Sequence, residues 1–221
     1  EILIYPGSEV IGLRQLIADL ESTDCSAMQA VLLDMYSDRP IRANAYEPGQ
    51  DPLEVCRYFD PDFDEAVKDW INPDTQQIFE CLRPTGNLRR RMFGANVNLS
   101  KIPLFKYAAS TYVAPGMHAI DGARLAPVRG AVLHFKYLQD FNDRVVLEAG
   151  RGEHQDNARE YKLYAARVER DSSLNCYWPG SVALEHPEQL LDLGIMRSST
   201  ALDTLVQRHV RKKSRAGADA V

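Results

Sequence analysis

The chain has 221 residues, of which 45% are hydrophobic and 26% are charged, and its formal net charge is −5 at pH 7. These values are ordinary for a globular protein and exclude a disordered chain, which combines few apolar residues with a high net charge. No apolar run approaches the roughly 18 residues of a transmembrane helix. The acidic balance argues against a protein that binds nucleic acid through its phosphates, so we expect no nucleic-acid partner.

The first forty residues predict a strand, a helix and a second strand. Residues 2–4 are a short apolar run that Pro6 and Gly7 end, and Ser8 is a candidate helix cap. Residues 26–36 contain too many apolar side chains for a half-exposed strand, which predicts a strand covered on both faces of a sheet. The helix between these strands is predicted from apolar residues at helical spacing, which are Val10, Leu13, Leu16, Ile17 and Leu20.

Residues 37–75 are predicted to form a long surface insertion. Five prolines interrupt this stretch, and prolines disfavour long regular elements because they remove a backbone donor and fix one dihedral angle. Within the insertion we expect only a short helix, in residues 51–58.

The rest of the chain predicts two more strands and a series of helices. Residues 99–107 alternate as a strand does, and Pro103 places that strand at a sheet edge because proline cannot donate to a ladder. Residues 130–135 predict a compact strand that ends near a histidine. Apolar spacing then predicts helices at 140–151, 156–170, 187–193 and 200–210, followed by a frayed basic end at 211–217. These elements predict an α/β protein with a mixed sheet and flanking helices.

The four cysteines are far apart and indicate a reducing compartment. They form no C-x-x-C pair and no dense pattern of the kind found in zinc sites or disulfide-rich secreted domains. We therefore expect a cytoplasmic protein whose cysteines are unpaired, small, buried side chains; they are Cys25, Cys56, Cys81 and Cys176.

Six short segments follow one another in an order and spacing that match a known family. They are EILIYPG at residues 1–7, LDMYSD at 33–38, RYFD at 57–60, LSKIPL at 99–104, LHFKY at 133–137 and RGEH at 151–154. On these segments the chain resembles the bacterial glycosyltransferase family 2-like proteins, a branch grouped with the family 92 enzymes. The resemblance extends from Glu1 to about Arg197 and rests on the series, because no single motif is specific.

The resemblance implies a GT-A fold and transfer of a sugar from a nucleotide-sugar donor to a glycan, lipid or protein acceptor. It also implies Mn²⁺ or Mg²⁺ under the diphosphate of the donor. In such proteins an Asp-x-Asp motif directly precedes a strand like residues 2–4, so Glu1 is expected to follow that motif. Residues 1–197 are then the C-terminal part of a GT-A domain whose N-terminal nucleotide-binding half is missing, and the isolated chain is expected to be inactive or weakly active. Residues 198–221 are expected to be a C-terminal helix and basic tail.

His134 is the candidate metal ligand. A departing diphosphate develops negative charge, which a hard cation held by carboxylates and one imidazole neutralises. In GT-A enzymes a C-terminal histidine often completes the metal shell, and the resemblance makes His134 the match. Ligands of open α/β sheets also gather at the carboxyl ends of strands, where His134 is expected. The alternative is a core histidine satisfied by a backbone carbonyl.

Asp34 and Asp38 are candidates for the catalytic base, which removes the proton from the acceptor hydroxyl. Asp34 lies in an apolar strand, where burial raises the pKa of a carboxyl group unless that group is paired. Asp38 lies in the turn just beyond that strand. A structural hydrogen-bonding role is the alternative for both.

Four further residues are candidates for contacts with the donor. Lys101 lies where the resembled family commonly has a lysine, and Arg91 belongs to three consecutive arginines that cannot all face one ligand. His118 follows a turn-like stretch and could approach the substrate. His154 lies in a loop between two predicted helices, where it closes over the phosphates or caps the second helix.

We interpret the chain as part of a metal-dependent glycosyltransferase. The alternative is a noncatalytic carbohydrate- or partner-binding module that keeps the sheet and an aromatic groove. A phosphoester hydrolase is disfavoured because the histidines are dispersed in the sequence. The basic tail either makes a peripheral contact with anionic lipid or is solvated. The aromatic residues that either stack on sugars or fill the core are Tyr36, Tyr58, Tyr137 and Trp178.

Overall fold

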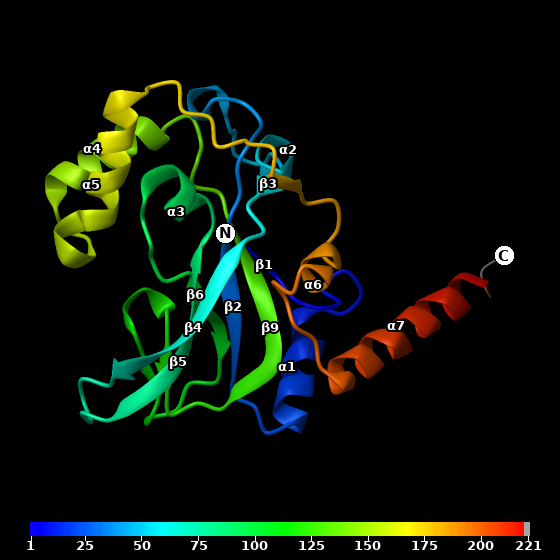
Figure 1. Ribbon diagram of the computed structural model, residues 1–221. Coiled ribbons are helices and arrows are strands. Elements are labelled where there is room, and N and C mark those ends of the chain that lie inside the picture. Colours follow the sequence, from blue (N-terminus) through cyan, green and yellow to red (C-terminus); the bar gives the residue numbers. More distant parts are fainter. Residues whose placement is uncertain (219–221) are drawn as a thin grey trace.

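A four-stranded mixed sheet lies at the centre of the computed structural model, which describes residues 1–218 (Figure 1). The order of its strands is β1 (Ile2–Ile4), β9 (Leu125–His134), β2 (Ala27–Asp34) and β6 (Ser100–Phe105). The central strands β9 and β2 are parallel, and the edge strands β1 and β6 are antiparallel to their neighbours. The predicted α/β class with a mixed sheet is therefore confirmed, and Pro103 lies on an edge strand as expected.

The central strand β2 is covered on both faces, as its composition predicts. Every residue of this strand is buried. Val31 and Leu33 belong to one apolar group, whereas Ala30 and Leu32 belong to another. Because successive side chains of a strand point to opposite faces, these two groups lie on the two sides of the sheet. The carboxyl ends of β2 and β9 therefore emerge from a core that excludes water.

Three helices meet beside the carboxyl ends of these strands (Figure 1). They are α3 (Asn87–Phe93), α4 (Phe141–Arg151) and α5 (Gln155–Arg170). An aromatic cluster holds them together, since the ring of Phe93 lies 4.5 Å from that of Tyr164 and the ring of Phe141 lies 5.0 Å from that of Tyr137. Tyr137 and Tyr164 are buried, so this cluster fixes the position of α5 relative to the sheet.

The other long helices are α1 (Leu13–Ser22) and α7 (Thr200–Ala218), and α7 extends away from the body of the molecule (Figure 1). Leu202 near the start of α7 packs with Leu16 and Leu20 of α1. Short elements complete the chain; they are η1 (Ile41–Ala43), α2 (Pro52–Val55), β3 (Tyr58–Phe59), β7 (Tyr112–Val113), η2 (Pro115–Met117), β8 (Ile120–Asp121), β10 (Val182–Ala183) and α6 (Gln189–Asp192).

A long hairpin corrects the prediction that residues 37–75 hold no long element. Its strands are β4 (Phe63–Ile71) and β5 (Ile78–Gly86), which pair over their whole length. Most side chains of β4 are exposed, so the strand lacks the apolar alternation by which a half-buried strand is recognised. The prolines at positions 61 and 73 flank β4 rather than interrupt it, and for that reason they do not prevent it.

Two predicted helix boundaries also differ from the structure. The first helix begins at Leu13 after Gly12, so Ser8 is not its cap; residues 7–11 instead form turns. The last helix continues to Ala218, so the basic segment 211–217 is helical rather than frayed. The remaining residues of the expected tail, 219–221, lie outside the described residues.

Within residues 1–218, no helix combines the length and the apolar composition needed to cross a bilayer. The four cysteines are buried and unpaired, as predicted.

Candidate functional site

The two parallel central strands end side by side in a buried pair of polar residues. Asp34, the last residue of β2, lies opposite His134, the last residue of β9. The Nδ1 of His134 lies 2.7 Å from the Oδ1 of Asp34. Asp34 is only 1% exposed, which places a carboxyl group in the core and requires that it be paired.

Arg89 of α3 supplies the charge that Asp34 needs. Its Nε donates to Oδ2 of Asp34 at 2.6 Å, and its Nη2 donates to Oδ1 at 2.9 Å. This forked contact is the strongest geometry for a pair of an arginine and a carboxylate. Burial alone raises the pKa of Asp34, but the charge of Arg89 and the hydrogen bond from His134 hold that pKa well below its ordinary value. Asp34 is therefore an ionised, fully bonded carboxylate, which is poorly suited to accept a proton as a base.

Arg89 also links this pair to helix α5. Its Nη1 donates to Oε1 of Glu160 at 3.0 Å, and the same carboxylate accepts a hydrogen bond from the hydroxyl of Tyr164. The Nζ of Lys136 lies 3.7 Å from Glu160 and 4.2 Å from the ring centre of Tyr164. Two carboxylates and two cationic side chains thus balance one another in one network.

The Nε2 of His134 is the atom that the network presents outward. Because the ionised Asp34 can only accept hydrogen bonds, Nδ1 of His134 carries a proton, and Nε2 is the nitrogen whose lone pair is available. Nε2 lies 3.9 Å from Oε1 of Glu1, and the side chain of His134 is 22% exposed. The side chain therefore reaches solvent at the point where residue 1 lies.

His134 and Glu1 together offer two donor atoms to a cation. Within the described residues, no group of three or more His, Cys, Asp or Glu side chains is arranged to hold a metal ion. Two donors fit a hard cation such as Mg²⁺, which keeps several waters and binds through one or two protein groups plus substrate phosphates. Asp34 would then not bind the cation itself, but would orient the imidazole of His134 through the hydrogen bond from Nδ1.

A cavity of about 760 Å³ lies beside this network. Its walls come from the β4–β5 hairpin, the loop 94–98, the turn at η2 and helix α5. Arg89 and Glu160 belong to its lining, as do His118 and His154. The network therefore joins the end of the sheet to a partly open cavity large enough for a small ligand.

Three of the predicted donor-binding residues lie around this cavity. The Nζ of Lys101 donates to the carbonyl oxygen of Gly116 at 2.7 Å, and Gly116 lines the cavity. The Nδ1 of His118 lies 2.8 Å from the carbonyl oxygen of Ser100. His154 is exposed, contacts Glu148 and stacks on the ring of Tyr161 at 4.4 Å.

The structure does not bring Arg91 and Asp38 to this site. Arg91 donates to the buried carboxylate of Asp60 at 2.8 Å and lies over the ring of Trp178. Asp38 is exposed, and its carboxylate accepts a hydrogen bond from the hydroxyl of Ser37 at 3.3 Å. Among the described residues, no hydrogen bond or ion pair connects either one to His134 or Arg89.

The aromatic candidates serve packing for the most part. Tyr36 and Tyr137 are buried in one apolar group, and Tyr58 packs against that group. Trp178 is half-buried, and its Nε1 donates to Asp60 at 2.9 Å.

Sequence reasoning misses Glu160 and Lys136, and it assigns Arg89 only to a basic run. The one available signal is Asp34, because a carboxylate in an apolar strand must have a cationic partner. That signal cannot name the partner, since α3 and α5 approach the strand from distant parts of the chain.

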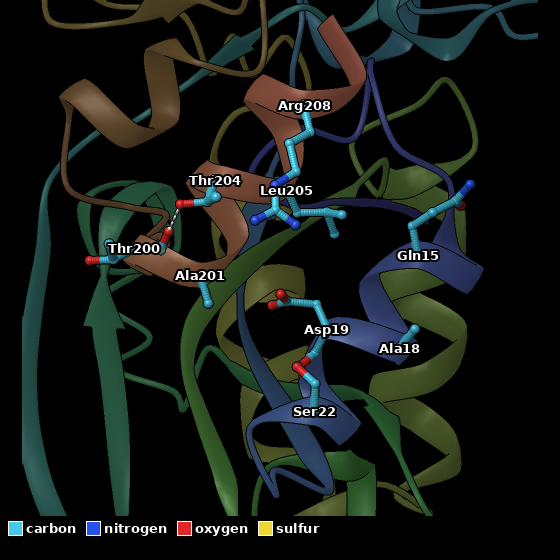
Figure 2. A pocket seen from close by; sticks show the side chains of 9 residues that line it. All are labelled: Gln15, Ala18, Asp19, Ser22, Thr200, Ala201, Thr204, Leu205 and Arg208. Atoms are coloured by element: carbon cyan, nitrogen blue, oxygen red, sulfur yellow. Dashed lines mark hydrogen bonds between the residues drawn. The ribbon is translucent and has the colours of Figure 1, made fainter. Parts of the chain in front are cut away.

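A second cavity, of about 520 Å³, lies between α1 and α7. Figure 2 shows Asp19 of α1 and Arg208 of α7 among the side chains around it. None of the predicted site residues lines this cavity.

No family model, no curated protein and no solved structure matches this chain.

Proposed function

We propose that this chain acts in glycosyl transfer, as part of a GT-A-type enzyme that moves a sugar from a nucleotide-sugar donor to an acceptor. The observation that carries the proposal is the oriented imidazole of His134. Its available nitrogen faces a carboxylate at the edge where two parallel strands end, which is where α/β sheets bind phosphorylated ligands.

The residues behind His134 fit a ligand-orienting role. Arg89 keeps Asp34 ionised, and Asp34 in turn holds the imidazole in one tautomer and one orientation. This is the arrangement by which a carboxylate raises the basicity of a metal-bound histidine. A cation bound by His134 and Glu1 would neutralise the charge that develops on a departing diphosphate.

Lys101 fits a contact with the diphosphate itself. It is half-buried on β6, and burial lowers its pKa, whereas the nearby charge of Glu1 opposes that shift. A cation that is close to Glu1 and not fully exposed can attract a phosphate without competing strongly with water.

A noncatalytic binding module is the second candidate. The observation that favours it is the lack, within residues 1–218, of a group of three metal-ligating side chains. Such a module would use the cavity beside Arg89 without any cation.

Binding of Mn²⁺ distinguishes these functions. The uptake of Mn²⁺ by the full chain is followed from the electron paramagnetic resonance signal of the free ion, with and without inorganic pyrophosphate. We expect pyrophosphate to promote uptake, and His134→Ala to weaken it by about tenfold or more. His186→Ala, which changes an exposed histidine elsewhere, should bind as the wild type does. Equal uptake by the wild type and His134→Ala, or none by either, would favour the binding module.

A further inference from the structure

Two residues that line the cavity beside the buried network each hold a buried polar donor that the described residues do not satisfy. The Nε of Arg83 and the Nδ2 of Asn98 are buried and have no hydrogen-bond partner among the described residues. Both residues line the cavity. Leaving a buried donor unpaired costs about 1–3 kcal/mol, so these two groups call for a ligand that offers acceptor atoms.

His118 offers the opposite kind of group in the same cavity. The carbonyl oxygen of Ser100 can only accept, so the Nδ1 of His118 donates to it, and Nε2 is left as an acceptor. Gly116 makes room for this ring edge. It has a φ of 70°, and a Cβ atom at this position would lie 2.7 Å from Nε2 of His118.

The burial of His118 favours its neutral imidazole. Burial is the largest cause and lowers its pKa, and the nearby charges of Lys101 and Arg89 act in the same direction. The hydrogen bond to Ser100 and the charge of Glu160 act in the opposite direction without reversing the shift. At neutral pH the imidazole therefore has a free lone pair.

A sugar matches this set of groups better than a phosphate or an apolar molecule does. Each sugar hydroxyl can accept a hydrogen bond from Arg83 or Asn98 and can also donate one, to Nε2 of His118. A phosphate satisfies only the donors. The half-buried indole of Trp70, which also lines the cavity, adds the apolar ring on which the carbon face of a sugar can lie.

We propose that this cavity is the acceptor site, that the acceptor is a sugar, and that Nε2 of His118 takes the proton of the attacking hydroxyl. This inference rests on the proposed function. The hydroxyl oxygen forms the bond to the anomeric carbon while the bond from that carbon to the diphosphate oxygen breaks. The diphosphate leaves with the bonding electron pair, and the proton stays on the imidazolium until solvent takes it.

The carboxylates of the site are less suited to this step. Asp34 is buried and bonded to both Arg89 and His134. Glu160 is engaged by Arg89 and Tyr164, with Lys136 nearby. A proton placed on either one would break a buried ion pair, whereas a proton on His118 breaks none.

The binding half of the proposal is tested without any knowledge of the donor. Saturation-transfer NMR with glucose, galactose, mannose and N-acetylglucosamine should detect at least one sugar bound to the full chain. Asn98→Asp keeps the Oδ1 that accepts from the amide of Ser100 and replaces the Nδ2 donor with an acceptor. We expect it to weaken sugar binding by about tenfold. Asn175→Asp, the same change at an exposed position, should have no effect.

The catalytic half is tested by transfer to the sugar that binds, from a panel of uridine, guanosine and thymidine diphosphate sugars. His118→Gln should lower kcat by about 100-fold or more, with a much smaller change in KM. It should also abolish the loss of wild-type activity at acid pH, where the imidazole becomes protonated. Gly116→Ala, which crowds Nε2, should lower kcat in the same way. Thermal unfolding of both variants distinguishes a loss of kcat from misfolding.

The outcomes separate this inference from the proposed function. Normal uptake of Mn²⁺ with pyrophosphate, together with no sugar binding or with full transfer activity of His118→Gln, would overturn the inference alone. Sugar binding that Asn98→Asp weakens, together with no uptake of Mn²⁺, would overturn the proposed function and the role of His118 as a base, and would leave the cavity as a sugar-binding site.

Discussion

At the scale of single residues, Asp34 determines how the site is built. Its carboxylate has two bonded partners and almost no contact with water. Removing one member of such a buried pair is strongly destabilising, because the other charge is left without compensation. Asp34→Asn should lower the free energy of unfolding by about 3 kcal/mol. This value is at the lower end of the usual range because Arg89 still has an ion pair with Glu160 in the variant.

Urea unfolding measures this loss, and Asp38→Asn is its matched control. Asp38 is exposed, so the same chemical change there should alter stability by less than about 0.5 kcal/mol. The pKa of Asp34 is lower in the folded chain than its unfolded value of about 3.9. Its contribution is therefore complete above that value and is lost as the pH falls through the folded pKa. A deficit of Asp34→Asn that persisted undiminished in strong acid would contradict this assignment.

Lys136 gives the site a second pH dependence, of the same sign as that of Asp34 but at alkaline pH. Burial, with help from the charge of Arg89, lowers its pKa to about 8, whereas an unfolded lysine has a pKa of about 10.4. Between these values the unfolded chain holds a proton that the folded chain has released, so this residue makes stability rise with pH.

Comparison with Lys136→Met isolates this effect. From about pH 8 to about pH 10 the wild type should gain stability relative to the variant, as measured by urea unfolding at several pH values. Lys162→Met, at an exposed position of α5, should follow the wild type throughout. Parallel curves for the wild type and Lys136→Met would show that Lys136 titrates normally.

The candidate site could be predicted from the sequence only where one segment contained the signal. His134 follows a compact apolar run, so its place at the end of a strand can be predicted, and an aspartate in an apolar strand needs a partner. The identity of the partners depends on how α3 and α5 pack, through rings such as Phe93 and Tyr164 that are distant in sequence. The packing of these helices is a tertiary contact, and no local sequence pattern predicts it.

At the scale of elements, the contact between β1 and β9 depends on a residue without a side chain. A Cβ atom at Gly130 would lie 2.7 Å from the carbonyl oxygen of Ile4 on the neighbouring strand. Gly130→Ala must therefore separate the two strands or shift the backbone, at a cost of about 1–3 kcal/mol. Since β1 brings Glu1 toward His134, this variant should also weaken uptake of Mn²⁺.

Gly150→Ala is the control for that variant. Gly150 lies in α4, and a Cβ atom there meets nothing within 4 Å. The same substitution should therefore stabilise the chain by about 0.4–1 kcal/mol, because alanine favours the helix. Thermal unfolding of both variants gives the comparison, and a destabilised Gly150→Ala together with a neutral Gly130→Ala would refute it.

The β4–β5 hairpin is an example of an element that is difficult to predict from the sequence. Buried strands such as β2 are recognised because the core selects apolar residues for them. The side chains of β4 mostly face solvent, so its residues are selected for little besides backbone pairing, and the pattern resembles that of a loop. Asn72, at the tip of the hairpin, donates to Asp121 on β8, which is a contact that appears only when distant segments meet.

At the scale of the whole molecule, charge is distributed unevenly. Residues 208–215 contain five lysines and arginines and no acidic residue, whereas the complete chain has a formal net charge of −5. Leu202 anchors α7 to the body, but residues 210–214 are exposed. The distal part of α7 therefore carries positive charge, whereas the chain as a whole is acidic. This helix end is a surface suited to anionic partners, and it is distinct from the cavity and from the end of the sheet.

This separation predicts that the distal part of α7 contributes to binding of anionic lipid and not to folding. A chain that ends at Val210 should unfold with a free energy within about 0.5 kcal/mol of the complete chain, since residues 211–214 are exposed. The complete chain should cosediment with vesicles that contain about 30% phosphatidylserine, because each cation near such a surface contributes about 1 kcal/mol. Lys212→Glu/Lys213→Glu should release it, as should salt at about 1 M. Lys162→Glu/Arg170→Glu is the control, because it changes the net charge equally at exposed positions of α5. Equal release of both double variants from the vesicles would show that net charge governs the contact, and not the position of the charges on α7.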